Sequence, residues 1–260
     1  MPSPMPTFRD GLGSLVFGFR FLLRRPESLP FAAVPVLVVF ALSAFAVFAS
    51  VRWALPAVRE LLPTFEGELG RAAAGAVTWF ATVLVALVGI VLAFVLAPTL
   101  SAPALERLVG MVEQARGAPP RPPLGWLREV WLGLRASLLG LAVFSPVLLL
   151  LFVLEFLVPV LVVITLPLRI IVASLWVAYA LFDYPQSLRG YPLRARFRLL
   201  RQAIAPALGF GLGCSALFWL PCATPFVLPI GVVAASELFW RIVQANPTLG
   251  QPPSMREDPR

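Results

Sequence analysis

Uncharged apolar runs divide the chain into segments long enough to cross a membrane. Residues 29–51 form a run of 23 uncharged residues, and residues 72–98 form a run of 27. A helix needs about 20 apolar residues to cross the hydrocarbon core. We therefore predict one long transmembrane helix in each of these two runs.

Two longer apolar regions are interrupted by proline and predict helical hairpins. Residues 136–182 contain only two charges, Glu155 and Arg169, and residues 202–236 contain four prolines and no charge. A proline inside a helix removes a backbone hydrogen bond and clashes with the preceding turn. We expect Pro-broken hairpins over about 136–182 and 202–240.

The second hairpin is predicted to have short arms. A turn around residues 221–225 leaves about 16 residues on each side. Such arms reach roughly 24 Å, less than the ~30 Å hydrocarbon core, so we expect a partly penetrating or re-entrant pair. Glu237 follows this hairpin, and we interpret it as an interfacial cap.

Three segments between the apolar regions have helical periodicity with charged residues opposite an apolar face. Helices of this type lie in the headgroup zone and attract anionic lipids. The alternative is a basic vestibule that attracts anions. The predicted apolar faces are Leu105, Leu108, Val109 and Val112; Leu127, Val130, Trp131 and Leu134; and Leu193, Phe197, Leu200 and Ile204.

Composition agrees with a membrane-embedded chain. Of the 260 residues 59% are hydrophobic and 13% are charged, and the mean hydropathy is +0.88. Soluble domains contain about 25% charged residues. We predict an all-α integral membrane protein with two long transmembrane helices, two hairpins and amphipathic interfacial helices. It forms one domain over residues 1–245, and a disordered tail follows over 246–260.

The residue types that are missing exclude most catalytic chemistry. The chain contains no His and no Lys, so all 21 positive charges are Arg. This excludes His-based triads, lysine Schiff bases and the P-loop lysine. The two cysteines, Cys214 and Cys222, have no accompanying soft ligand. We expect no enzyme, no metal, no cofactor and no nucleic-acid partner.

The distribution of arginine predicts the orientation in the membrane. Arginines gather in residues 1–28, 103–135 and 183–201, whereas the 52–71 loop balances three Arg with three Glu. If both hairpins return to the side they leave, the arginine-rich segments share one side, which the positive-inside rule makes cytoplasmic. We expect a multi-pass membrane protein with a cytoplasmic N-terminus.

Three arginines are candidates for binding an anion. Arg24 and Arg25 stand before the first predicted span, where paired guanidiniums offer forked donors close to a helix N-terminus. Arg169 lies inside the first hairpin, with Glu155 as its counter-charge. The alternatives are positive-inside anchoring for the first two and a structural pair at the far interface for the third.

A glycine cluster in the second hairpin predicts close helix packing. Gly209, Gly211 and Gly213 give small-residue spacing, which allows helix backbones to approach. A phosphate-binding loop is the less favoured interpretation, because no strand precedes the glycines and no basic residue follows them.

Four stretches, taken in their order along the chain, resemble a known family. They are the opening GFRFLLRRP, Ala97-Pro98 before a Leu- and Glu-containing helix at 104–116, Phe182-Asp183-Tyr184-Pro185 before an arginine-rich helix, and LPIGVVAASELFW at 228–240. Over roughly residues 8–242 the chain resembles the CysZ-type sulfate permeases and the related etoposide-induced membrane proteins. This resemblance implies the fold predicted above, a location in the bacterial inner membrane, a homo-oligomer, and sulfate uptake that supplies cysteine biosynthesis.

One departure from the family pattern concerns the anion site. The resemblance implies a Gly-Leu-Arg-type turn, with adjacent arginines just after the proline that opens the first span. Here Arg24 and Arg25 precede Pro26, and Glu27 follows it. The leading hypothesis is passive conduction of sulfate or a similar small oxyanion. The alternative is a non-transporting scaffold or lipid-interacting protein with the same fold, which the acidic substitution favours.

Overall fold

The computed structural model describes residues 4–61, 67–118, 126–220, 223–246 and 249. Every regular element in these residues is helical, and five helical stretches are long and apolar enough to cross a membrane. The chain is therefore an all-α membrane protein, as predicted. The five stretches are Pro26–Leu61, Gly70–Leu100, Leu138–Leu157, Pro159–Ser187 and Pro225–Ala245.

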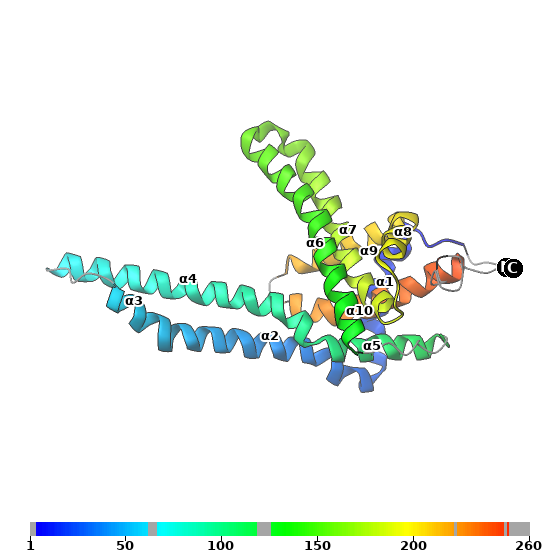
Figure 1. The fold of residues 1–260 in the computed structure, drawn as a ribbon, viewed down its shortest axis with the longest axis horizontal. Helices are drawn as coiled ribbons and strands as arrows, with labels where there is room; N and C mark the ends of the chain where they lie inside the picture. The colour runs from blue at the N-terminus through cyan, green and yellow to red at the C-terminus, as the bar shows by residue number, and fades with distance from the viewer. Residues whose placement is uncertain (1–3, 62–66, 119–125, 221–222, 247–248, 250–260) are drawn as a thin grey trace. The chain divides into compact units, whose positions relative to one another are not determined.

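The chain forms two compact units. The first unit combines the segment Met1–Ala32 with Ala104–Arg260, and the second unit is Ala33–Pro103. The first unit contains α1 (Phe8–Arg24), α5 (Ala102–Ala115), α6 (Trp126–Leu157), α7 (Val162–Ser187), α8 (Leu193–Gln202), α9 (Ile204–Phe218) and α10 (Thr224–Ala245) (Figure 1).

The second unit is a pair of long apolar helices. Its first arm is α2 (Leu29–Ala49), which continues through a π-helical turn at Ser50–Ala54 into α3 (Leu55–Leu61). Its second arm is α4 (Glu68–Leu100), which lies beside α2 (Figure 1). A Cβ atom on Gly89 would lie 2.6 Å from Cβ of Ala46, so glycine permits this contact. The arms correspond to the predicted spans over 29–51 and 72–98.

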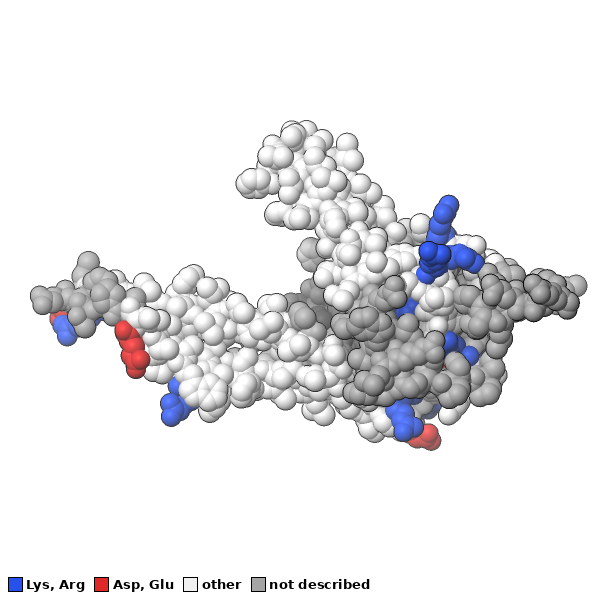
Figure 2. Space-filling view, viewed as in Figure 1, with Lys and Arg blue, Asp and Glu red and all other residues white. Residues whose placement is uncertain are grey.

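Helices α6 and α7 form the first predicted hairpin. They turn at a 3-10 segment, Pro159–Leu161, where Pro159 is accommodated at the first position of the segment. Prolines inside the two helices, such as Pro146 and Pro167, do not end them. The outer part of the hairpin exposes large apolar side chains, including Leu149, Phe156 and Ile164. On the face shown in Figure 2, the outer part of the α6–α7 hairpin shows no charged side chain.

Helices α9 and α10 form the second predicted hairpin, but its arms are unequal. Helix α9 has 15 residues, close to the predicted arm, whereas α10 has 22. The prediction of an interfacial cap at Glu237 is wrong. Its side chain is fully buried within α10, because arginines neutralise it and the helix continues to Ala245.

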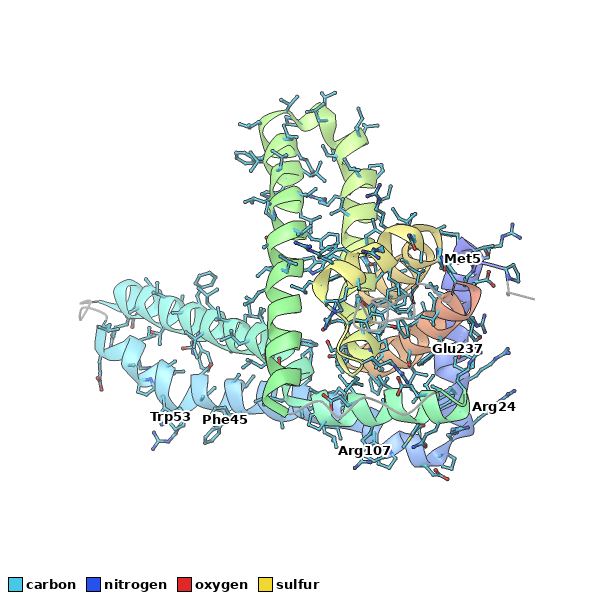
Figure 3. All side chains as sticks on the ribbon, turned by 45° about the vertical axis from the view of Figure 1, so that its right-hand side comes forward. Met5, Arg24, Phe45, Trp53, Arg107 and Glu237 are labelled. Atoms are coloured by element: carbon cyan, nitrogen blue, oxygen red, sulfur yellow. The ribbon has the colours of Figure 1, made fainter. Side chains whose placement is uncertain are left out.

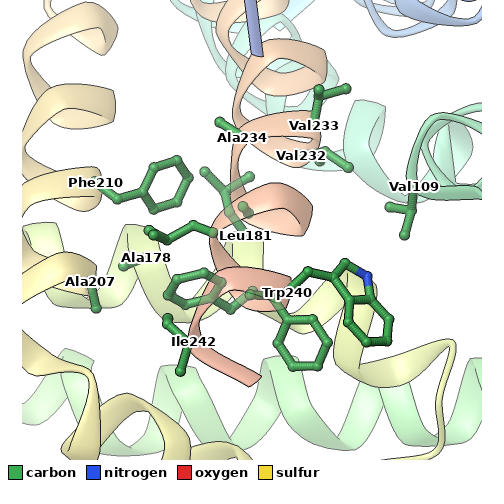
Figure 4. Close-up of a cluster of buried hydrophobic side chains, with 14 of the residues drawn as sticks. Val109, Ala178, Leu181, Ala207, Phe210, Val232, Val233, Ala234, Trp240 and Ile242 are labelled. Atoms are coloured by element: carbon green, nitrogen blue, oxygen red, sulfur yellow. The ribbon is translucent and has the colours of Figure 1, made fainter. Parts of the chain in front are cut away.

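The core of the first unit surrounds α10. Val232, Ala234 and Ile242 of α10 are buried together with Leu181 of α7 and Phe210 of α9 (Figure 4). The glycine cluster has the predicted packing role. A Cβ atom on Gly209 would overlap the carbonyl oxygen of Phe8, and one on Gly211 would overlap that of Ser174. Helices α1 and α7 therefore approach α9 through its glycines.

The three predicted amphipathic segments differ in what their apolar faces contact. In α5, Leu105, Leu108, Val109 and Val112 are buried in the core of the first unit, so this face packs against protein. In α8, Leu200 is buried but Ile204, which begins α9, is exposed. The side chains of 127–134 lie outside the described residues, as does almost all of the predicted tail at 246–260.

Candidate anion-binding site

A cavity of about 490 Å³ in the first unit gathers four arginines. Its described lining comes from α1, from the end of α5 and from α10. Arg24 and Arg25, both predicted from the sequence, line it together with Arg20 and Arg116. Glu237 is the one acidic residue in that described lining. Figure 3 labels Arg24 near the end of α1 and Glu237 on α10.

Helix α1 and the residue that follows it supply three of these arginines, Arg20, Arg24 and Arg25. Arg20 and Arg24 are four residues apart and therefore lie on the same face of the helix. Helix α1 ends at Arg24, and Pro26 begins the 3-10 segment Pro26–Ser28. The buried Ser28 hydroxyl donates to the carbonyl oxygen of Arg25 at 2.7 Å, which fixes this break.

Arg25 is further placed by an aromatic ring. Its guanidinium carbon lies 4.9 Å from the centroid of the Phe21 ring, a cation–π distance. Phe21 is itself buried and lines the cavity. The cavity wall at Arg25 is therefore held by packing as well as by the helix break.

Arg116 and Glu237 form a two-point ion pair in the lining of the cavity. Nε of Arg116 donates to Oε2 of Glu237 at 2.7 Å, and Nη2 pairs with Oε1. Arg241, one turn along α10, also donates from Nε to Oε1 at 2.9 Å. Two guanidiniums thus share one buried carboxylate, which satisfies the requirement that a buried charge be paired.

The electrostatic balance of the cavity favours anions. Its described lining holds four guanidiniums and one carboxylate. Burial lowers the pKa of Arg116, and the positive charge of Arg241 lowers it further. An anion near Arg116 would relieve that repulsion. Because guanidiniums present forked donors, the site suits an anion with two or more oxygens, such as a tetrahedral oxyanion.

The N-terminus of α2 does not contribute to this site. The described lining contains neither the 3-10 segment nor any α2 residue. Glu27, whose position departs from the family pattern, is exposed and is also outside that lining. The guanidiniums, rather than a helix dipole, therefore define the cavity.

Arg169 lies on α7, apart from the cavity of Arg24 and Arg25. Its Nη1 donates to Oε2 of Glu155 at 2.9 Å, across the α6–α7 hairpin. It lines a different cavity of about 760 Å³, whose other described lining residues are mostly apolar and include Phe152 and Trp176. The structure thus brings together two of the three predicted arginines.

Sequence reasoning missed three residues of the site, Arg20, Arg116 and Glu237. Arg20 precedes Arg24 by one helical turn, so helical spacing was a usable signal. Arg116 and Glu237 are 121 residues apart. A single sequence carries no signal for their contact, since the pairing depends on how α5 packs against α10.

A second charged cluster missed by sequence reasoning joins α7 to α8. Arg196 is almost fully buried; its Nη1 pairs with Asp183 and donates to the Ser187 hydroxyl at 3.1 Å, and its Nε donates to the Tyr191 carbonyl at 2.9 Å. Burial lowers its pKa to about 10, so the guanidinium stays charged at neutral pH. Its position on the apolar face, between Leu193 and Leu200, was the available signal.

The fold and the cavity define a multi-pass, all-α membrane protein with an arginine-lined pocket. The sequence model of the family described as "Sulfate transporter CysZ/Etoposide-induced protein 2.4" matches residues 14–229. This match covers most of the chain, and the protein belongs to that family. A search of curated proteins found no match to the chain.

Proposed function

We propose that the protein is a passive permease for sulfate or a similar small oxyanion, and that the arginine-lined cavity binds the ion. The observation that carries this proposal is the convergence of four guanidiniums on one cavity whose described lining holds a single acid. The family description, which names a sulfate transporter, supports the same substrate class. Selectivity would come from the arginines, as in other anion pores.

Several features of the proposal come from the sequence. The chain shows no ATP-binding motif, and this favours passive movement down the gradient. Arginine placement favours an N-terminus in the cytoplasm, and the family resemblance favours the bacterial inner membrane. A homo-oligomer and a role in cysteine biosynthesis follow from the family resemblance and stay predictions.

Arg169 stays a prediction as a second contact along the anion path. Its guanidinium already pairs with Glu155, so an anion there would compete with a fixed carboxylate. We therefore expect a smaller effect on uptake from Arg169→Gln than from changes at Arg24 and Arg25.

Uptake of radiolabelled sulfate into proteoliposomes tests the proposal. We expect the wild-type protein to raise the initial uptake rate above that of empty liposomes, and the double variant R24Q/R25Q to lower it at least tenfold. The matched control is R194Q/R198Q, which removes two exposed arginines of α8 outside the described cavity lining. Wild-type uptake no faster than in empty liposomes would exclude a sulfate permease.

The alternative is a non-transporting protein that binds anionic lipids through α8. Arg194, Arg198 and Arg201 are exposed on this helix, while Leu199 and Leu200 are buried. Helix α8 begins six residues after the last residue of α7, close to the end of a candidate span. Stabilisation by phosphatidylglycerol that is lost in R194Q/R198Q, without any sulfate uptake, would favour this alternative.

A further inference from the structure

The buried carboxylate of Glu237 is placed in the wall of the arginine cavity without being free to bind a cation. Both of its oxygens accept from Arg116, and one of them also accepts from Arg241. Glu237 comes from α10 and Arg116 from the segment after α5, and both side chains line the cavity. The carboxylate therefore acts on the site through the arginines it holds.

The guanidinium of Arg116 contacts Glu237 and also lines the cavity. A guanidinium has five N–H donors, and the edge formed by Nε and Nη2 is directed at Glu237. The side chain nevertheless keeps 29% of its surface exposed and lines the cavity. An oxyanion in the cavity would thus meet an arginine whose positive charge is already partly neutralised.

From this arrangement we infer that Glu237 is an internal counter-anion that competes with the bound oxyanion for Arg116 and keeps its binding weak enough for release. This inference rests on the proposed function, because it assumes that the cavity binds an oxyanion. A conducting site must bind its ion firmly enough to admit it and loosely enough to let it leave. Four arginines without a carboxylate would hold a dianion and slow its exit.

Arg241 affects how strongly Glu237 competes with the oxyanion for Arg116. It shares Oε1 of Glu237 with Arg116 and lies outside the described lining of the cavity. Removing Arg241 would leave the carboxylate to Arg116 alone, and this would weaken oxyanion binding. Removing the charge of Glu237 would free Arg116, and this would tighten binding. The two changes are therefore expected to act in opposite directions.

Equilibrium binding of radiolabelled sulfate to the detergent-solubilised full-length protein tests this inference. We expect the sulfate Kd of Glu237→Gln to fall roughly tenfold, equivalent to about 1.4 kcal/mol, and the Kd of Arg241→Gln to rise severalfold. In proteoliposomes, Glu237→Gln should also lower the uptake rate at saturating sulfate. A purely structural role would weaken binding in both variants.

The matched control is Glu113→Gln. Glu113 is a buried carboxylate on α5 that pairs with Arg189 at 2.9 Å, and it lies outside the described cavity lining. The change removes the same charge, so a general field effect would tighten sulfate binding equally. We expect its Kd to stay within twofold of the wild-type value.

The outcomes separate the inference from the proposed function. If wild-type protein binds sulfate but Glu237→Gln binds it equally or more weakly, the counter-anion role is overturned while the permease proposal stands. If Glu237→Gln does not fold, Arg241→Gln decides, and unchanged or tighter binding in that variant overturns the inference. If the wild-type protein binds no sulfate, the proposed function fails first, and the inference that rests on it is overturned as well.

Discussion

Two of the acid–arginine clusters in the described residues, one at Glu155 and one at Glu237, differ in their surroundings. Glu155 and Arg169 pair across the α6–α7 hairpin, and their side chains keep 25% and 32% of their surface exposed. Glu237 has no exposed side-chain surface and is shared by Arg116 and Arg241. The first pair joins neighbouring helices, whereas the second joins segments 121 residues apart.

The difference shows that a charge in an apolar segment does not by itself mark a site. Glu155 and Arg169 neutralise each other next to an apolar cavity. Glu237 instead lies where α1 and the end of α5 present four arginines to one cavity. The same residue types therefore support different interpretations, and the number of converging elements distinguishes them.

The largest expected effect is on stability at Glu237. Glu237→Ala leaves Arg116 and Arg241 without their shared carboxylate, and breaking a buried pair in this way costs about 3–5 kcal/mol. Reversible unfolding in mixed micelles measures the change in free energy of unfolding. Glu155→Ala is the matched control and should cost much less. Equal losses in the free energy of unfolding would show that Glu237 and Glu155 contribute equally to stability despite their different burial.

A smaller effect is expected at the α7–α8 contact. Asp183 keeps 17% of its side chain exposed and pairs with the buried Arg196. Asp183→Asn retains an acceptor but removes its charge, and a hydrogen bond to a charged group contributes about 1.5–3 kcal/mol. We expect a loss in the free energy of unfolding of about 2 kcal/mol in the same micelle assay. A loss as large as that of Glu237→Ala would show that the exposure of the carboxylate does not determine how much each ion pair contributes to stability.

The smallest expected effect is the coupling between Glu155 and Arg169. A double-mutant cycle with Glu155→Gln and Arg169→Gln should give a coupling free energy below about 1 kcal/mol, as for exposed pairs and for polar contacts between membrane helices. A coupling free energy of about 3 kcal/mol or more is typical of a buried pair. It would show that Glu155 and Arg169 are buried against another surface.

Much of the fold could be predicted from hydropathy and proline. Long apolar runs predicted α2 and α4, and the prolines of 136–182 predicted a hairpin, whose turn the structure places at Pro159–Leu161. These predictions succeed because an apolar helix and a proline-broken turn depend on local sequence. The sequence placed the end of the second hairpin at about residue 240, whereas α10 continues to Ala245.

The candidate site was predictable only in part. Arg24 and Arg25 were identified from their position before a helix break, and the structure places both in the arginine cavity. Arg169 was identified from its place in an apolar segment, yet it lies in another cavity. Position along the chain does not report which side chains converge, and that convergence gives the cavity its charge.

The sequence by itself determined that this chain is an all-α membrane protein with arginine as its only basic side chain, and its motifs identified the CysZ family. Hydropathy suffices for the fold class, because the length and apolar content of a segment decide whether it can cross the bilayer. The tertiary structure alone decided that Arg116 and Glu237 meet the α1 arginines. Electrostatic interactions depend on distance in space, and the packing of α1, α5 and α10 sets that distance.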